Sequence, residues 1–298
     1  MNHRTNRLSA AVAVSAAVAC ATASLAAAAV IDGTWRPDRL KGTPDADTIN
    51  AKGGPDFVRG LAGDDAIRGG WGPDLLIGNL GNDTIEGNQG ADLVVGNDGN
   101  DLLSGNHGRD RVFAGPGDDT VNGGSGAQPA RRHGFRGRFA GPGPLGDRLH
   151  GGAGNDTLNG DRGRDLVSGG IGDDSVNGSN GNDRVFANIG RDTVTGGEGD
   201  DVLWALARVD VTALGDQEGD TLDGGNGNDR FNVRDGEADR VTCGEGRDKV
   251  RADQFDVIVD ATAENANGSC EVVKRSSQLD SDAPENQVQS PPEDRRQA

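Results

Sequence analysis

Hydrophobic and polar positions in this chain repeat with a period of nine residues. From Gly42 to Asn122 the sequence divides without a gap into nine units, of which "GNLGNDTIE" (78–86) is typical. The sixth place of every unit is aspartate and the eighth is aliphatic, whereas glycine recurs at places one, two and four. A short fixed period of this kind predicts a solenoid of stacked units instead of an ordinary globular core.

The same pattern continues beyond the first nine units. Six more units run from "GGAGNDTLN" to "GGEGDDVLW" (151–204), and looser units follow from 219 onward. The interruptions at 127–146 and 205–218 predict loops that leave the stack and return to it. The aspartates at place six, with neighbours in register, are Asp47, Asp56, Asp65, Asp74, Asp83, Asp92, Asp101, Asp110, Asp119, Asp147, Asp156, Asp165, Asp174, Asp183, Asp192, Asp201, Asp220 and Asp229.

Each unit predicts one turn and one short strand. Glycines at places one, two and four allow positive φ and a close backbone approach, so places one to six predict a turn. Places seven to nine predict a three-residue strand whose middle side chain, at place eight, points into the core. Two units then complete one coil of about eighteen residues, with parallel strands roughly 4.8 Å apart. The well-formed units alone predict about seven to eight such coils.

Composition excludes an ordinary domain and limits the partners. Glycine accounts for 50 of 298 residues, aromatic residues for 3%, and tyrosine is absent, so bulky side chains for a globular core are too few. The formal net charge is −18, and aspartate dominates the acidic residues. This charge argues against nucleic acid as a partner and favours cations.

Stacking would place like charges in files, because units two apart fall in register. Neighbouring carboxylates about 4.8 Å apart repel by roughly 0.9 kcal/mol in water and several times more at an effective dielectric near 20. A divalent cation between successive turns would reverse the sign of this interaction. The available ligands are all oxygen atoms, and the histidines and cysteines show no zinc-type spacing, so the sequence predicts multiple Ca²⁺ sites. The alternative is that the aspartates only cap turns through hydrogen bonds to the backbone. The two files would begin with Asp47, Asp65 and Asp83 in one and Asp56, Asp74 and Asp92 in the other.

The units resemble the RTX, or haemolysin-type, calcium-binding nonapeptide GGxGxDxUx over about residues 42–126 and 147–250. The resemblance implies an all-β fold, a parallel β-roll solenoid, in which place-six aspartates and turn carbonyls of two stacked loops hold each Ca²⁺. Carried over, the ligands are the eighteen aspartates named above. Alanine replaces the place-one glycine at Ala51, Ala114 and Ala187, where we expect weaker or empty sites.

Two further expectations concern the C-terminal part of the chain. Residues 219–274 predict irregular repeats followed by a cap, which resembles the ending of many secreted bacterial relatives of the repeat family. In an exported protein Cys243 and Cys270 are expected to form a disulfide that ties this cap. The polar segment 275–298 predicts disorder.

The N-terminal segment predicts export. Arg4 and Arg7 precede an alanine-rich apolar run that ends near Ala29, which is typical of a secretory signal peptide at 1–29. A lipid anchor on Cys20 and an uncleaved membrane anchor are the alternatives. The array would then span 30–126, followed by a basic Gly/Pro-rich loop at 127–146 and a second array at 147–204.

These features predict a secreted calcium-binding protein whose β-roll folds on binding Ca²⁺ outside the cell. It would act as a structural or interaction module in the medium or at the cell envelope, with an envelope or extracellular polymer as a partner. A calcium-dependent adhesin, a haemolysin-like toxin and an enzyme accessory module are the alternatives. The motifs HExxH and GxSxG are absent, and no apolar segment beyond residue 30 could enter a bilayer, so neither an enzyme nor a toxin is expected.

Overall fold

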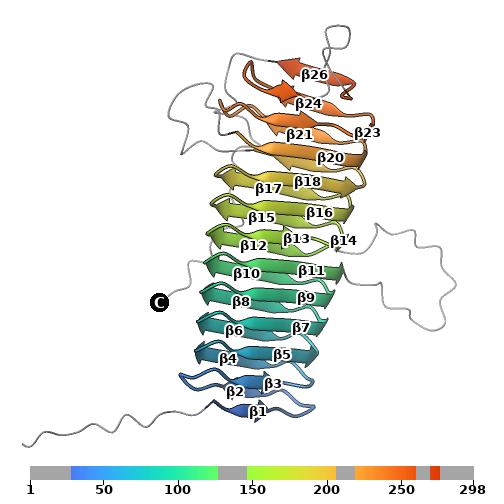
Figure 1. Cartoon of the computed structure of the whole chain (residues 1–298). Helices are drawn as coiled ribbons and strands as arrows, with labels where there is room; N and C mark the ends of the chain where they lie inside the picture. Colours follow the sequence, from blue (N-terminus) through green and yellow to red (C-terminus); the bar gives the residue numbers. More distant parts are fainter. Residues whose placement is uncertain (1–27, 127–145, 206–218, 260–268, 276–298) are drawn as a thin grey trace, which may run out of the picture.

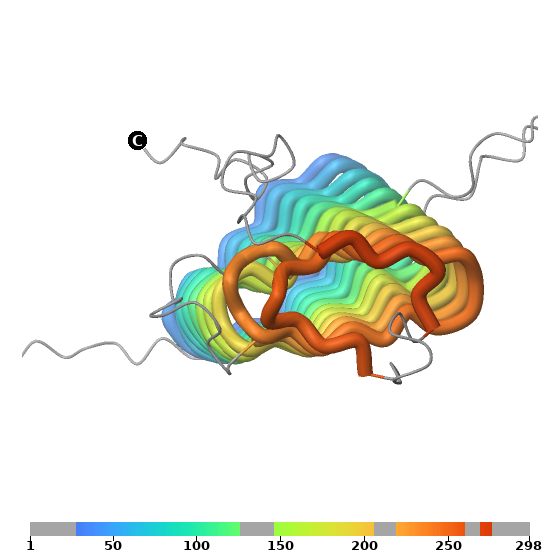
Figure 2. Tube along the Cα trace, turned by 90° about the horizontal axis from the view of Figure 1, so that it is seen from above, coloured from blue at the N-terminus to red at the C-terminus, as the bar shows by residue number. Residues whose placement is uncertain are grey.

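The chain forms a parallel β-solenoid in a computed structural model that describes residues 28–126, 146–205, 219–259 and 269–275. Two β-sheets face each other along the stack, and each coil contributes a strand to both (Figure 1). Viewed along the stack, successive coils superpose as a flattened tube (Figure 2). The described segments contain no helix, and therefore none that could cross a membrane. The predicted signal peptide, the predicted loop at 127–146, the predicted insertion at 205–218 and the predicted C-terminal tail lie wholly or almost wholly outside the described residues.

The first sheet has 14 strands. These are β1 (Val30–Asp32), β3 (Thr48–Asn50), β5 (Ala66–Trp71), β7 (Thr84–Gly90), β9 (Leu102–Gly108), β11 (Thr120–Gly126), β13 (Thr157–Asn159), β14 (Arg162–Gly163), β16 (Ser175–Gly181), β18 (Thr193–Glu198), β20 (Thr221–Gly227), β22 (Arg240–Thr242), β23 (Glu245–Gly246) and β25 (Val257–Ile258).

The second sheet has 12 strands. These are β2 (Arg39–Lys41), β4 (Phe57–Ala62), β6 (Leu75–Leu80), β8 (Leu93–Asp98), β10 (Arg111–Pro116), β12 (Arg148–Ala153), β15 (Leu166–Ile171), β17 (Arg184–Ile189), β19 (Val202–Trp204), β21 (Arg230–Val233), β24 (Lys249–Ala252) and β26 (Val272–Arg275).

The register of the sheets follows the repeat. Ile67 on β5 pairs with Ile85 on β7, one coil of eighteen residues further along. The insertions leave this register intact, since Val121 on β11 pairs directly with Leu158 on β13. Strands before Gly42 and after residue 219 also join the sheets. The stack is therefore longer than the seven to eight coils expected from the well-formed units alone.

Most strands are also longer than the three residues predicted from the sequence. For example, β7 has 7 residues and extends through places one to four of the following unit. Within it Asn88 adopts a φ of 75°, so the chain bends at place two, yet Asn88 and Gln89 still pair with Asn106 and His107 of β9. Because adjacent turns share one shape, their backbones pair as strands do.

The aliphatic side chains at place eight form the core, as predicted. Ile67, Leu76, Ile85 and Leu103 are each at most 1% exposed, and the place-eight residues of both sheets belong to one continuous cluster. Burial of one such side chain contributes about 1.5–3 kcal/mol, so stability accumulates only as coils stack.

The C-terminal end is closed by the predicted disulfide between Cys243 and Cys270. Both half-cystines are buried, and Val273 of β26 packs against the core cluster. β26 pairs with β24 and forms the last strand of the second sheet. The disulfide-tied cap predicted from the sequence is thereby confirmed, and it protects a solenoid end that would otherwise expose apolar surface.

Candidate metal-binding site

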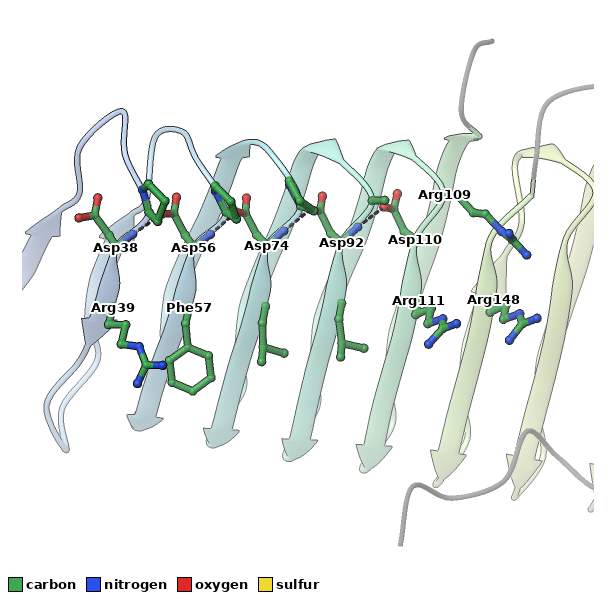
Figure 3. A pocket seen from close by; sticks show the side chains of 16 residues that line it. Asp38, Arg39, Asp56, Phe57, Asp74, Asp92, Arg109, Asp110, Arg111 and Arg148 are labelled. Carbon is green, nitrogen blue, oxygen red and sulfur yellow. Dashed lines mark hydrogen bonds between the residues drawn. The ribbon is translucent and has the colours of Figure 1, made fainter. Parts of the chain in front are cut away.

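All the aspartates predicted as ligands lie in two files that follow the two turn edges of the stack. None of them is more than 4% exposed. The first file contains Asp47, Asp65, Asp83, Asp101, Asp119, Asp156, Asp174, Asp192 and Asp220. The second file, part of which is drawn in Figure 3, contains Asp56, Asp74, Asp92, Asp110, Asp147, Asp165, Asp183, Asp201 and Asp229.

One carboxylate oxygen of each aspartate fixes the spacing between coils. The backbone N–H of Asp83 donates to Oδ1 of Asp101 at 2.7 Å, and the N–H of Asp101 donates to Oδ1 of Asp119 at 2.7 Å. The ladder crosses the first insertion, where the N–H of Asp110 donates to Oδ1 of Asp147 at 2.7 Å. The capping role considered for these residues is therefore real, but it uses only one of the two oxygens.

The second oxygen is buried without a protein partner at most places in the files. Oδ2 of Asp65, Asp83, Asp101, Asp156 and Asp183, among others, accepts no hydrogen bond from the described residues. An unpaired buried oxygen is costly, and a charged one more so. A repeated orphan atom of this kind points to a ligand that the protein itself does not supply.

The place-one glycine, which has no Cβ, lets this orphan oxygen approach the backbone closely. A Cβ atom built on Gly78 would lie 1.9 Å from Oδ2 of Asp83, and one built on Gly60 would lie 2.0 Å from Oδ2 of Asp65. A Cβ on Gly42 would also lie 2.3 Å from the carbonyl oxygen of Gly60 in the next coil. Carboxylate and carbonyl oxygens thus converge on one space, and such hard oxygen donors suit Ca²⁺.

This geometry corrects one detail of the expected turn. The glycines at place one do not have positive φ, whereas places two and four do, as at Asn79 (87°) and Gly81 (119°). Glycine is therefore needed at place one for space and at place four for conformation. Alanine already fills the place-one position at Ala51, Ala114 and Ala187, and the weaker sites expected there remain a prediction.

Burial and neighbouring carboxylates raise the pKa values of the file members. Burial raises the pKa of Asp92 to about 7, with further contributions from Asp110 and Asp74. Burial raises the pKa of Asp183 to about 8. Asp47 at the end of its file behaves differently, because hydrogen bonds from the N–H groups of Thr43 and Ala29 outweigh the effect of its burial and lower its pKa. Without a bound cation, burial and like charges therefore disfavour ionisation of most carboxyl groups in the files.

The structure adds residues to the files that the sequence prediction omitted. The N–H of Asp38 donates to Oδ1 of Asp56 at 2.8 Å, so Asp38 begins the second file. Asp239 and Asp248 continue the two files, and Glu271 accepts the N–H of Asp248. Asp38 could have been found from "GTWRPDRLK" (33–41), which already has glycine, aspartate and leucine at places one, six and eight. Glu271 has no such signal, because glutamate replaces aspartate in an irregular unit.

The two turn edges differ at place five. Along the first file, asparagine and aspartate side chains form an outer ladder, in which the N–H of Asn100 donates to Oδ1 of Asn82 at 2.8 Å. Along the second file, place five begins with prolines such as Pro55, which have no N–H. There a groove of about 760 Å³ is lined by the aspartates, by Phe57 and by arginines that include Arg111 (Figure 3).

Comparison with known families agrees with this geometry. The family model described as the RTX calcium-binding nonapeptide repeat (4 copies) matches residues 32–67, 41–76, 68–103, 95–127, 143–176, 177–207 and 212–237, which together span more than half of the chain. No curated protein matches the chain.

Proposed function

Because the chain belongs to the RTX calcium-binding nonapeptide repeat family, whose repeats bind Ca²⁺ at multiple sites, we propose that the two aspartate files are the ligands in this protein. Each ion would be held by Oδ2 atoms of place-six aspartates and by turn carbonyls of neighbouring coils. The observation that carries this assignment is the buried Oδ2 atom without a partner, repeated coil after coil beside a place-one glycine.

Calcium binding and folding would be coupled in this arrangement. A bound Ca²⁺ ion supplies the positive charge that compensates the stacked carboxylates. Each coil completes the ligand set of its neighbour, so binding at one turn favours formation of the next. Extracellular calcium sites typically bind at about 10⁻⁴–10⁻³ M, and a ligand that binds only the folded state stabilises it by mass action. The chain would therefore remain expanded at low free calcium and fold where calcium is abundant.

We further propose that the protein is secreted. The predicted signal peptide at 1–29 supports this, and so does the buried disulfide between Cys243 and Cys270, since disulfides persist mainly in oxidising compartments. The repeat β-roll is a structural calcium-binding module rather than a catalytic fold. The proposed role is therefore that of a structural or interaction module and not that of an enzyme.

Exposed tryptophans favour a calcium-dependent adhesin as the more specific function. Trp35 is 73% exposed and Trp71 is 63% exposed. Gly53 lies between them, since a Cβ built on it would be 2.8 Å from the Trp35 ring and 3.5 Å from Cβ of Trp71. Two exposed indoles on one edge are unusual and mark a binding surface.

The residues beside Trp71 indicate the chemistry of the partner. They form a groove of about 500 Å³ whose lining includes the amides of Asn88 and Gln89. Its cations are compensated by acids, because Lys52 pairs with Asp32 at 3.5 Å and Arg68 pairs with Glu86 at 3.2 Å. An exposed indole beside amides and paired charges suits a neutral polysaccharide at the cell envelope or in the medium.

Far-UV circular dichroism during calcium titration tests the calcium proposal, with magnesium as the control. A cooperative coil-to-β transition near millimolar calcium that magnesium does not reproduce is expected. A spectrum that is β-rich in chelator and insensitive to calcium would contradict coupled folding.

For the adhesin, binding of neutral glycans is expected to quench tryptophan fluorescence and to be lost in Trp71→Ala. Retention of glycan binding in that variant would reject the groove as the binding site.

A further inference from the structure

The turn that precedes β22 departs from the repeat by adding carboxylates. The ten residues "VRDGEADRVT" (233–242) form a unit with one extra residue, in which Val233 takes place one by pairing with Ala252 and Gly236 keeps the positive φ (106°) of place four. Asp235 and Glu237 lie on either side of this glycine. The place-six residue, Asp239, remains aspartate. Two acidic side chains therefore join the place-six carboxylate in this turn.

These side chains meet inside the structure instead of pointing to solvent. Ligand oxygens of Asp235, Glu237 and Asp239 lie within 4.8 Å of one another, and the three residues are 4%, 3% and 0% exposed. Oδ1 of Asp239 accepts the N–H of Asp220 at 2.8 Å. Oδ2 of Asp239, which is fully buried, has no hydrogen-bond partner among the described residues. The cluster thus contains a buried oxygen that lacks the partner it needs.

The following coil concentrates further charge on the same place. Oδ2 of Asp253 accepts the N–H of Gly236 at 3.0 Å, and Oδ1 of Asp256 accepts the N–H of Asp239 at 3.3 Å. Arg275 donates to the carbonyl oxygens of Asp253 and Asp256, at 3.0 and 2.9 Å. The side chain of Arg275 therefore binds the backbone of Asp253 and Asp256.

We propose that Asp235, Glu237 and Asp239 form a further Ca²⁺ site whose ligand set differs from that of the repeat turns. Three carboxylates of one turn hold the ion, whereas the repeat turns combine place-six aspartates with main-chain carbonyls. Ligand oxygens within 4.8 Å of one another can share one Ca²⁺ ion, since two oxygens on opposite sides of such an ion are about 4.6–5.2 Å apart.

The ligand charge predicts the place of this site in the binding sequence. Calcium affinity rises with the number of carboxylate ligands, so this site binds more tightly than the repeat sites and fills first. It lies one unit before Cys243, where the disulfide closes the cap. The C-terminal coils would therefore become ordered at lower calcium than the rest of the stack. This inference rests on the proposed function in that Ca²⁺ is the ion that the whole chain binds.

Equilibrium dialysis of the full chain against radioactive calcium tests the proposal. The wild type is expected to show one ion bound at least about tenfold more tightly than the others. The variants Glu237→Gln and Asp235→Asn, which remove one charge each, are expected to lose this tight class. Asp223→Asn, which changes an exposed carboxylate on the neighbouring β20, is the matched control and is expected to retain it.

Circular dichroism in excess calcium separates loss of the site from loss of the fold. Glu237→Gln is expected to form the β-roll, because it keeps the shape of the side chain and removes only its charge. Asp235→Asn, which does the same at the second acid, serves as a second variant if Glu237→Gln does not fold. A uniform set of sites in the wild type, or a tight class that survives in the folded variants, would overturn this inference while leaving calcium-coupled folding intact. Absence of calcium-coupled folding in the wild type would instead reject the proposed function.

Discussion

Replacement of Asp101 by asparagine is expected to have opposite effects on stability with and without calcium. Asp101 lies in the middle of the first file and is 2% exposed. Its Oδ1 accepts the N–H of Asp83 at 2.7 Å, while its Oδ2 has no partner. Asparagine can keep the hydrogen bond through Oδ1 and replaces only the orphan oxygen by an uncharged NH₂ group. The variant therefore removes the charge of the side chain while it keeps the hydrogen bond of the ladder.

The size of the stability change without calcium follows from the pKa of the Asp101 carboxyl. Burial, followed by the charges of Asp83, Asp119 and Asp98, raises the pKa of Asp101 from 3.8 to about 7, although the hydrogen bond from Asp83 opposes the rise. A shift of about three units corresponds to at most about 4 kcal/mol by which ionisation opposes the metal-free fold above pH 7. Without calcium, Asp101→Asn is expected to stabilise the fold by up to this amount. With calcium, loss of a charged ligand is expected to weaken that site at least tenfold, or by about 1.4 kcal/mol.

Urea unfolding at about pH 8 in excess calcium and in chelator measures both effects. If the chain is unfolded in chelator, refolding by trimethylamine N-oxide provides the same comparison, since excluded osmolytes favour compact states. Asp101→Ala is the control, because alanine removes the ladder hydrogen bond as well and should destabilise the fold in both conditions. Destabilisation of equal size by Asp101→Asn with and without calcium would refute the assignment of Oδ2 as a metal ligand.

Four further outcomes are expected. Because burial raises the pKa of Asp92 to about 7 from 3.8, the metal-free fold binds more protons than the unfolded chain, so circular dichroism in chelator should show its stability falling as pH rises from about 4 to 8. Gly78→Ala should raise the calcium concentration at the midpoint of folding, because its Cβ would displace the Asp83 carboxylate. An unchanged midpoint would argue against Oδ2 of Asp83 as a calcium ligand. Leu103→Ala should destabilise the calcium-bound fold by about 2–5 kcal/mol in urea titrations. Reduction of the Cys243–Cys270 disulfide should cost roughly 3–4 kcal/mol and expose the C-terminal coils first in hydrogen exchange.

The regular part of the site could be predicted because a strict repeat gives equivalent residues equivalent environments. Once place eight is recognised as apolar and place six as aspartate, stacking puts Leu103 in the core and Asp101 in a file. The irregular ends could not be predicted in this way. Glu271 and Asp256 join the files only because the final coils still stack, and no nonapeptide pattern marks them.

The sequence by itself thus determined the period, the core column, the two anionic files and the disulfide-tied cap, since each depends on residue type at a fixed spacing. Tertiary structure alone decided how the two oxygens of one carboxylate divide their roles, because the N–H that binds Oδ1 of Asp147 belongs to Asp110, across an insertion. It also decided that Asp235, Glu237 and Asp239 converge within 4.8 Å. Contacts between such groups depend on how each coil packs on the next. The spacing of residues along the chain does not specify that packing.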